Sequence, residues 1–579
     1  MWKTLIKSIR EYKKLSLLTP AYITFEVIIE CIIPFITARL VNEIKAGTGL
    51  DTILKYGAVL LVLASISLTF GRLAGSTSAT AASGFGRNLR KDMFYNIQSF
   101  SFENIDRFSS SSLVTRLTTD VTFVQHAYMM IIRTAIRSPL MLIFAIVMAF
   151  IMGGKLAFIF VFMIPLLAIG LYFVIKKAFP IFKRLFPKYD ELNDSIHENI
   201  QGIRVVKSFV REDYEKQKLG KAATALASEF TIAEKILAFN GPFMQFCLYV
   251  NMVLILTLGS YTIVTTGGLD FNVGQLSSLM VYSFQTLMSL MMLSMVFVMI
   301  AIADESGHRI VEVLKEKSTL TNPHNPVYDV KDGSVEFSDV SFRYSEKAER
   351  MALENINLSI KSGETIGILG GTGSSKSSLI QLIPRLYDAT EGTVKVGGLD
   401  VRAYDIEALR NTVSVVLQKN LLFTGTIREN LLWGNENATD NEIKEAAILA
   451  QADDFIMRFP DGYDTRIEQG GTNVSGGQKQ RLCIARALLK KPKILILDDS
   501  TSAVDTHTDA KIRQAFRRYI PETTKIIIAQ RVASVKEADR IVLMDKGGIA
   551  AVGTHEELMK SSEIYREIYE SQSKAGEQE

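Results

Sequence analysis

The stretch Ile494-Leu-Ile-Leu-Asp-Asp-Ser-Thr-Ser-Ala-Val-Asp505 decides the fold of the C-terminal half of this chain. Its four leading apolar residues predict a buried strand of a parallel sheet, and Asp498 ends that strand. A carboxylate at such a place can hold a Mg²⁺ ion beside phosphate groups. Asp499 follows, where a longer carboxylate would align an attacking water. Residues 525–529 predict a second buried strand, and Gln530 comes directly after it.

A glycine-rich segment upstream indicates which ligand these residues meet. Gly370-Gly-Thr-Gly-Ser-Ser-Lys-Ser377 follows a strand predicted over residues 365–369 and opens a helix predicted over 378–386. This context predicts a phosphate-binding loop for ATP rather than an ordinary strand–helix turn. Lys376 would neutralise phosphate charge, and the Ser377 hydroxyl would coordinate Mg²⁺. The predicted nucleotide-binding residues of this loop are Gly370, Gly371, Thr372, Gly373, Ser374, Ser375, Lys376, Ser377 and Ser378.

Ser375 departs from the usual pattern of such a loop, because a glycine is expected immediately before the lysine. A Cβ atom here could crowd the β-phosphate. It would also cost about 1 kcal/mol if the backbone needed a positive φ at this residue. We expect ATP binding to be retained but weakened.

The N-terminal half predicts a bundle of membrane-spanning helices. Six apolar segments are long enough to cross a bilayer, which takes about 20 helical residues. Lysine and arginine gather before the first segment and after the second and fourth. This distribution predicts a multi-pass protein of the plasma membrane with both termini and the nucleotide-binding domain in the cytoplasm. The segments cover residues 15–41, 53–73, 136–152, 156–175, 242–265 and 276–303.

The domain boundaries follow from composition. Residues 1–314 are predicted to form the transmembrane domain, in which the cytoplasmic connections continue the helices tens of Å beyond the lipid. A polar, proline-containing linker is expected over 315–334. Alternating strands and helices predict an α/β nucleotide-binding domain over 335–570, followed by a disordered tail at 571–579.

Charged and sulfur-containing side chains inside the apolar segments are candidates for contact with a transported substrate. Glu26 and Glu30 lie on one face of the first segment, and Arg72 lies in the second. They form either a polar wall for a cationic or amphiphilic substrate, or groups paired with one another or in contact with water. Methionines of the last segment either give a pliable lining or pack against helices and lipid. The candidates among them are Met288, Met292 and Met295.

The overall composition excludes some classes of function. A net charge of +4 is small for 579 residues and argues against a nucleic-acid partner. The three cysteines lie in or beside apolar runs, so a disulfide framework is not expected.

A second candidate phosphate contact lies at Val474-Ser-Gly-Gly-Gln478, which opens a predicted helix but carries no lysine of its own. Because the chain already has a phosphate loop, this segment is expected to donate hydrogen bonds to ATP held by a second copy or a relative. The residues concerned are Ser475, Gly476, Gly477 and Gln478.

Taken together, these motifs resemble those of a half-transporter of the ATP-binding cassette (ABC) exporter family, over nearly the whole chain. The resemblance rests on the phosphate loop, Gln418 in Val415-Val-Leu-Gln-Lys, the segment at 474–478, the Asp498 strand and the Ser502-Ala-Val-Asp505 turn, in that order. It implies a type I or type IV exporter fold, in which six transmembrane helices with long cytoplasmic extensions precede an α/β nucleotide-binding domain.

The resemblance also assigns roles to single residues. Tyr344 would stack on adenine, Gln418 would link the Mg²⁺ site to the membrane domain, and Asp505 would mark a turn that crosses a dimer interface. Short coupling helices are expected near residues 104–112 and 210–216. The implied catalytic residues are Asp499, Gln530 and Gln418, and the implied Mg²⁺ ligands are Ser377, Gln418 and Asp498.

Two of these positions depart from the family pattern, which has glutamate at position 499 and histidine at position 530. Aspartate is one methylene shorter, and glutamine cannot carry a proton. With Ser375, these changes resemble the degenerate half of a heterodimeric multidrug exporter, whose ATP is split mainly at the partner's site. The expected partners are a homologous half-transporter, the lipid bilayer and an amphiphilic small molecule. The alternatives are a homodimeric lipid or peptide exporter with slow ATPase activity and a regulatory, nucleotide-sensing membrane subunit.

Overall fold

The computed structural model describes residues 1–345, 348–499 and 504–576 and consists of two compact units. The first unit comprises Met1–Gln98 and Ser110–Glu316, and the second comprises Ser99–Ser109 and Lys317–Glu579. A short piece of the N-terminal half therefore folds with the C-terminal unit.

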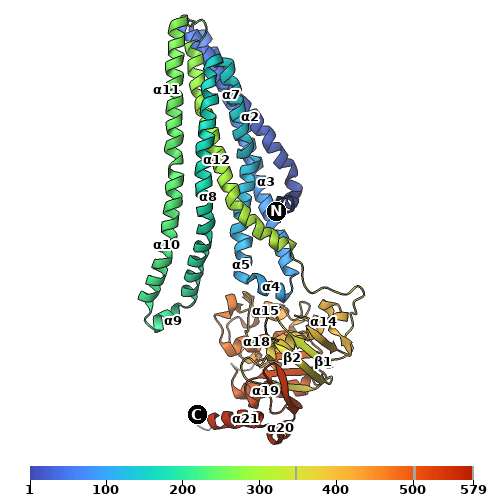
Figure 1. The fold of residues 1–579 in the computed structure, drawn as a ribbon. Helices are drawn as coiled ribbons and strands as arrows, with labels where there is room; N and C mark the ends of the chain where they lie inside the picture. Colours follow the sequence, from blue (N-terminus) through green and yellow to red (C-terminus); the bar gives the residue numbers. More distant parts are fainter. Residues whose placement is uncertain (346–347, 500–503, 577–579) are drawn as a thin grey trace. The chain divides into compact units, whose positions relative to one another are not determined.

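The first unit is helical throughout most of its length (Figure 1). Helix α2 packs along α3, α12 packs against both α7 and α2, and α10 runs beside α8. With 49 residues, α3 is about 75 Å long at 1.5 Å per residue, far more than the thickness of a bilayer. The α-helices of the first unit are α1 (Trp2–Leu5), α2 (Lys13–Lys45), α3 (Leu50–Gln98), α5 (Ser110–Thr115), α6 (Val121–Ile132), α7 (Thr134–Gly153), α8 (Phe158–Gln201), α9 (Ile203–Ser208), α10 (Glu212–Ala238), α11 (Asn240–Thr266) and α12 (Val273–Lys315).

The described residues contain five helical runs that are long and apolar enough to cross a membrane, whereas the sequence predicts six segments. One of the five, Ser110–Val174, contains the third predicted segment and all but the last residue of the fourth. Within it, α7 and α8 are separated by the 3₁₀ turn Gly154–Ala157, which begins at a positive φ of 49°. A count of six crossings therefore remains a prediction.

Helix α12 supplies a hydrogen bond to replace the one that a proline removes from α2, and a second bond to the next carbonyl. Pro34 has no N–H, so the carbonyl of Glu30 loses its donor within the helix. The side chain of Gln285 donates to that carbonyl at 3.3 Å, and the Tyr282 hydroxyl donates to the carbonyl of Cys31 at 2.7 Å. Such a contact from a neighbouring helix is one way in which a membrane-spanning helix tolerates a proline.

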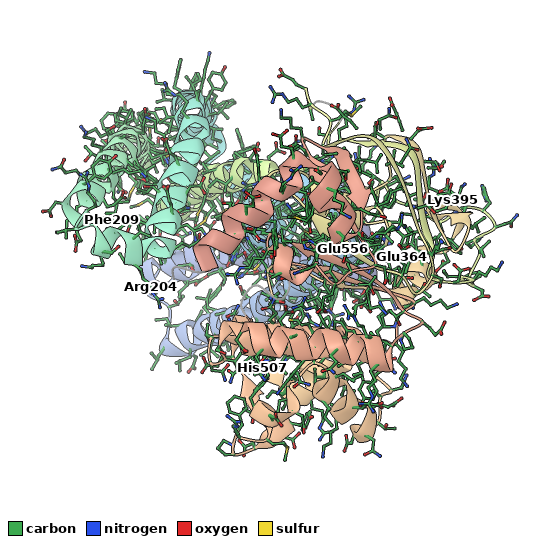
Figure 2. The ribbon with its side chains drawn as sticks, turned by 90° about the horizontal axis from the view of Figure 1, so that it is seen from below. Arg204, Phe209, Glu364, Lys395, His507 and Glu556 are labelled. Atoms are coloured by element: carbon green, nitrogen blue, oxygen red, sulfur yellow. The ribbon has the colours of Figure 1, made fainter. Side chains whose placement is uncertain are left out.

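The second short helix lies earlier than the resemblance predicts. Residues 210–216 were expected to form it, but α9 spans Ile203–Ser208, and α10 already begins at Glu212. Figure 2 shows Arg204 in α9 and Phe209 directly after it, in the connection from α8 to α10, and Phe209 is 73% exposed.

The second unit is built on a six-stranded sheet with the order β12-β11-β3-β10-β9-β6. Strands β11, β3, β10, β9 and β6 are parallel, and β12 pairs antiparallel at one edge. All five residues of β9 are buried, as the apolar run predicts. The strands are β3 (Thr365–Leu369), β6 (Val413–Val416), β9 (Ile494–Asp498), β10 (Thr524–Ala529), β11 (Arg540–Asp545) and β12 (Gly548–Gly553).

A smaller antiparallel sheet and a set of helices complete the second unit. The sheet has the order β2-β1-β4-β5, with bounds Val335–Phe342 for β1, Leu353–Ile360 for β2, Glu391–Val396 for β4 and Leu399–Asp400 for β5. The helices used below are α4 (Phe102–Phe108), α13 (Lys376–Gln381), α18 (Gly476–Leu489), α19 (Thr506–Tyr519), α20 (His555–Ser561) and α21 (Glu563–Gly576).

Helix α21 continues to Gly576, although a disordered tail was expected from residue 571. Two hydrogen bonds explain the difference, since Gln572 donates to the carbonyl of Gln530 and accepts from the N–H of Val532, which ties this part of the helix to the loop after β10. Residues 577–579 of the predicted tail lie outside the described residues.

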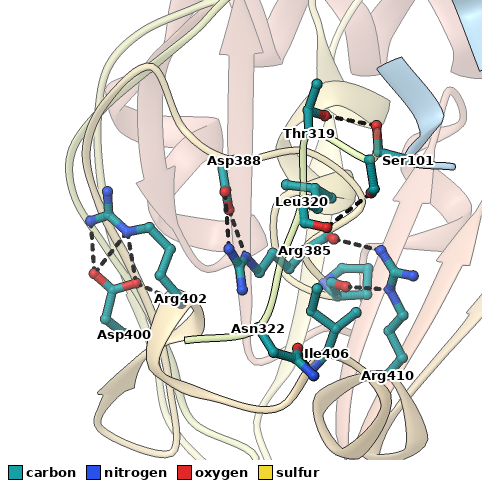
Figure 3. Close-up of polar contacts among 12 residues, drawn as sticks. Ser101, Thr319, Leu320, Asn322, Arg385, Asp388, Asp400, Arg402, Ile406 and Arg410 are labelled. Atoms are coloured by element: carbon teal, nitrogen blue, oxygen red, sulfur yellow. Dashed lines mark hydrogen bonds and ion pairs between the residues drawn. The ribbon is translucent and has the colours of Figure 1, made fainter. Parts of the chain in front are cut away.

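Helix α4 overlaps the first expected coupling helix at residues 104–112 and belongs to the second unit. Ser101 caps it, and the Ser101 hydroxyl also pairs with that of Thr319 at 2.7 Å (Figure 3). Near the end of the helix, the Tyr387 hydroxyl donates to Asp106 at 2.6 Å. The start of the expected linker is thus held beside α4.

Candidate nucleotide-binding site

The parallel order of the sheet brings the predicted nucleotide residues together. The phosphate loop follows β3, Gln530 follows β10, Asp498 and Asp499 lie at the end of β9, and Gln418 follows β6. These four strands are neighbours, so their carboxyl ends meet at one edge of the sheet. Ligands of open α/β sheets bind at that edge.

Two oxygen donors lie side by side where Mg²⁺ is expected. The Ser377 hydroxyl donates to the Asp498 carboxylate at 3.2 Å. Burial raises the pKa of Asp498, while the bond from Ser377 and the charge of Lys376 act against that rise. A hydroxyl beside a buried carboxylate is a donor set that suits Mg²⁺, whose charge would favour the ionised carboxylate.

Lys376 lies over the phosphate loop. Its ammonium group donates to the carbonyls of Gly370 at 2.9 Å and Gly371 at 2.8 Å, and to the Ser374 hydroxyl at 3.2 Å. Burial lowers the pKa of Lys376, and the carboxylates Asp498 and Asp499 oppose this effect. The lysine is therefore positioned to neutralise phosphates that the loop receives.

Ser375 adopts the left-handed conformation that makes a side chain unfavourable. Its φ is 66° and its ψ is 25°, while Gly373 in the same loop has a φ of 83°. Most non-glycine residues avoid this region because Cβ approaches the following carbonyl. The backbone thus has a positive φ at Ser375, so the cost of about 1 kcal/mol for a side chain in this conformation applies.

We expect Ser375→Gly to strengthen ATP binding about fivefold, which corresponds to relief of about 1 kcal/mol of crowding by the Cβ atom. Stability should change by less than about 1 kcal/mol, because relief of backbone strain is offset by a more flexible unfolded chain. Titration with Mg-ATP would measure the affinity, and Ser375→Ala is the matched control because it keeps Cβ. Equal affinities for the glycine and alanine variants would contradict the expectation.

Asp499 is enclosed by two amide side chains. Its backbone N–H donates to the carbonyl of Ile528 at 3.0 Å, and its φ is 46°. The Gln530 amide donates to its carboxylate at 3.4 Å, and Gln418 also forms a hydrogen bond with it. Burial raises the pKa of Asp499, and the Gln418 bond and the charges of Lys376 and Arg531 only partly oppose this rise.

Tyr344 offers an aromatic surface beside the phosphate loop. Its hydroxyl pairs with that of Ser378 at 2.8 Å and donates to Gln381 at 3.1 Å. The ring meets Tyr387 edge to face, with the ring centres 5.2 Å apart, and is 42% exposed. A pocket of about 320 Å³ adjoins it. The exposed part of the ring is suited to stacking on a base.

The segment at 474–478 and Asp505 both open helices. Ser475 and Gln478 form a capping box at the start of α18, where Gly476 and Gly477 occupy the first two positions. Backbone N–H groups at these positions have no acceptor within their helix, which leaves them for a phosphate. Asp505 accepts a bond from the N–H of Thr508 and caps α19. Ser502 and Ala503 of the predicted turn lie outside the described residues.

The sequence of this chain matches two known protein families. The ABC transporter transmembrane region family matches residues 20–291, and the ABC transporter family matches 353–502. An uncharacterized ABC transporter ATP-binding protein of Bacillus subtilis, YfiB, is 39% identical over 547 residues, which cover 94% of each chain. The chain belongs to the ABC transporter family.

Other relatives and a solved structure are similar to this ABC transporter over most of its length. Rv1273c, an uncharacterized ABC transporter ATP-binding protein of Mycobacterium tuberculosis, is 34% identical over 98% of this chain and 97% of its own. The ATP-dependent lipid A-core flippase of Desulfotalea psychrophila is 34% identical over 84% of each chain. The structure of a bacterial Atm1-family ABC exporter with ATP bound has a TM-score of 0.84 at 23% identity and covers 97% of this chain and 99% of that one. The transporter therefore has the ABC exporter fold.

In the membrane unit of the transporter, the predicted charges meet a residue that sequence reasoning missed. Arg137 of α7 pairs with Glu26 at 3.3 Å and with Glu30 at 2.7 Å. Gly71 of α3 faces this cluster, and a Cβ atom there would lie 3.0 Å from the Glu26 carboxylate. Arg72 is exposed, and the ion pairs found among the described residues of this cluster do not include it. The structure thus favours the interpretation in which the two glutamates are held in ion pairs, and Arg137 is the partner of both.

A sequence signal for Arg137 exists, since Arg133 and Arg137 repeat the four-residue spacing of Glu26 and Glu30.

The methionines of α12 form no single buried group. Met288 is half-buried, while Met292 and Met295 are 39% and 59% exposed. Their role as a substrate lining remains a prediction.

Proposed function

We propose that this chain is one subunit of an ATP-driven exporter of amphiphilic molecules, and that its own nucleotide site hydrolyses ATP slowly or not at all. The observation that carries this proposal is the group formed by Asp499, Gln530 and Gln418, in which two amides engage the one carboxylate available to align water.

Geometry supports a slow site. The backbone of Asp499 is held by Ile528, so its shorter side chain cannot advance to compensate for the missing methylene. A displacement of about 1 Å in a catalytic group can cost about 100-fold in rate. Gln530 can touch a γ-phosphate but cannot ionise to stabilise charge that develops on it.

The remaining parts of the site are suited to holding ATP. Ser377, Asp498 and Gln418 would hold Mg²⁺, which would neutralise phosphate charge when bound. Lys376 would bind phosphate oxygens, and Tyr344 would stack on the base. The backbone amides of Gly476 and Gly477, at the start of α18, would complete the active site of a homologous partner subunit. ATP binding would then close the two nucleotide-binding domains and turn the membrane helices outward, with both termini in the cytoplasm of a plasma-membrane protein.

A homodimer is the second candidate, and burial around Asp499 favours it. A raised pKa makes this carboxylate a better proton acceptor near neutral pH, which suits a slow general base.

For the cargo, the relative that is a lipid A-core flippase supports an amphiphile with acyl chains, beside the multidrug class that we favour.

In the assembled transporter, we expect Asp499→Ala to lower ATPase activity less than about threefold. Removal of the corresponding glutamate of the partner chain should lower it about 100-fold, because only that group would align water well. Steady-state Mg-ATPase assays of the purified complex would compare the two variants. Equal losses would reject the division into a slow and an active site.

A further inference from the structure

The last helix of the chain contacts the loop that carries Gln530. The Gln572 side chain donates to the carbonyl of Gln530 at 2.8 Å, and the backbone N–H of Val532 donates to the Gln572 side-chain oxygen at 2.8 Å. One amide group thus bridges the loop on both sides of Arg531. Helix α21 lies at the C-terminal end of the chain in Figure 1.

The position of the Gln530 side chain depends on this loop. Gln530 is exposed, whereas Val532 two residues later is 1% exposed and fixes the far end of the loop. Between the end of β10 and Val532, the Gln572 bond holds the carbonyl of Gln530. The Gln530 amide, which reaches Asp499 at 3.4 Å, extends from that same residue.

Helix α21 is anchored firmly enough to act as a support. Tyr565 is fully buried, and its hydroxyl pairs with His555 at 2.7 Å. One turn later, the Tyr569 ring meets the His555 ring, with centres 5.2 Å apart, and the ammonium of Lys536 at 5.8 Å. Tyr565, Tyr569 and Gln572 are spaced four and three residues apart, which places them on one face of the helix.

We propose that Gln572 is a positioning residue of the nucleotide site, through which α21 holds Gln530 where it can meet the γ-phosphate of ATP. This inference rests on the proposed function, which assigns Gln530 to that phosphate. Loss of the bridge would let the Gln530 backbone move without changing any group that contacts the rest of the nucleotide. ATP binding should therefore weaken, while ADP binding, which lacks the γ-phosphate contact, should not.

The test uses the full chain and measures Mg-ATP and Mg-ADP affinities side by side. Gln572→Met keeps the length of the side chain and removes both hydrogen bonds. We expect it to weaken ATP binding about fivefold, in keeping with one lost hydrogen bond, and to leave ADP binding unchanged. Gln572→Glu keeps an acceptor for the N–H of Val532 but places a carboxylate oxygen against the carbonyl of Gln530. It should therefore weaken ATP binding and leave ADP binding unchanged, as Gln572→Met does. Glu570→Gln, an exposed change on the same helix, is the control.

A double-mutant comparison tests whether Gln572 acts on ATP binding through Gln530. In a Gln530→Ala background, Gln572→Met should cause no further loss of ATP affinity, because both changes remove the same contact. Equal weakening of ATP and ADP, or a loss that persists without Gln530, would overturn the inference. Unchanged ATP affinity in Gln572→Met would overturn it as well. If Gln530→Ala leaves ATP binding unaltered, the assignment of Gln530 in the proposed function fails instead.

Discussion

Replacing Asp499 by glutamate and Gln530 by histidine together should raise the ATPase rate of the purified chain about 100-fold. The glutamate would restore the methylene that the proposed site lacks, and the histidine would replace an amide that cannot ionise. The other parts needed for chemistry are present, since Ser377 lies beside Asp498 and Lys376 covers the phosphate loop. Two copies of the chain would also supply intact segments at 474–478.

Steady-state Mg-ATPase assays of the chain without a partner would measure the gain. The single changes separate the contributions of length and of charge. Adding Lys376→Ala to the double variant is the control, because it should abolish the new activity along with phosphate binding. A wild-type chain that already turns over rapidly, and that loses this activity in Asp499→Ala, would contradict the proposal and favour the homodimer.

The second large effect concerns the ion pairs inside the membrane unit. Arg137→Met would remove the cation that pairs with both Glu26 and Glu30, and Glu26 is only 7% exposed. Breaking a buried ion pair from one side costs about 3–5 kcal/mol. We expect the lower end, about 3 kcal/mol, because the Arg137 side chain is 34% exposed. Most of the variant should fail to reach the folded, monodisperse state in detergent.

Size-exclusion profiles and thermal unfolding of the purified protein would measure this loss. The matched control removes all three charges at once, with Glu26→Gln and Glu30→Gln added to Arg137→Met, and should recover much of the stability. Such recovery would attribute the loss to unpaired charge rather than to missing packing. If Arg137→Met unfolds at the wild-type temperature, the cluster contributes no stability and a substrate-binding role for the glutamates becomes the better explanation.

The parts of the molecule that the sequence predicts are those in which function constrains neighbouring residues. The phosphate loop is an example, because close approach to phosphate demands small residues and a lysine at fixed spacing between a strand and a helix. The strand that ends at Asp498 is another, since a strand buried on both faces must be apolar throughout.

Contacts between distant segments could not be predicted in this way. Gln572 and Gln530 lie 42 residues apart, and no periodic pattern marks either as the partner of the other. The pairing of Arg137 with Glu30 spans 107 residues, and the four-residue spacing of Arg133 and Arg137 marks the two arginines without marking which helix they meet. The second short helix was placed too late because its position came from the family resemblance, whereas the turn at 209–211 separates α9 from α10 in this chain.

The contact between α4 and Tyr387 has a consequence for synthesis of the chain. Asp106 and Tyr387 are separated by 281 residues, although both belong to the same folding unit. At about 5–20 residues per second, a ribosome needs about 15–55 s to make the second after the first. Throughout that interval, Phe102–Phe108 has been synthesised but lacks the surface against which it folds. The nucleotide-binding unit is therefore completed only near the end of translation, after all the predicted membrane segments have been synthesised.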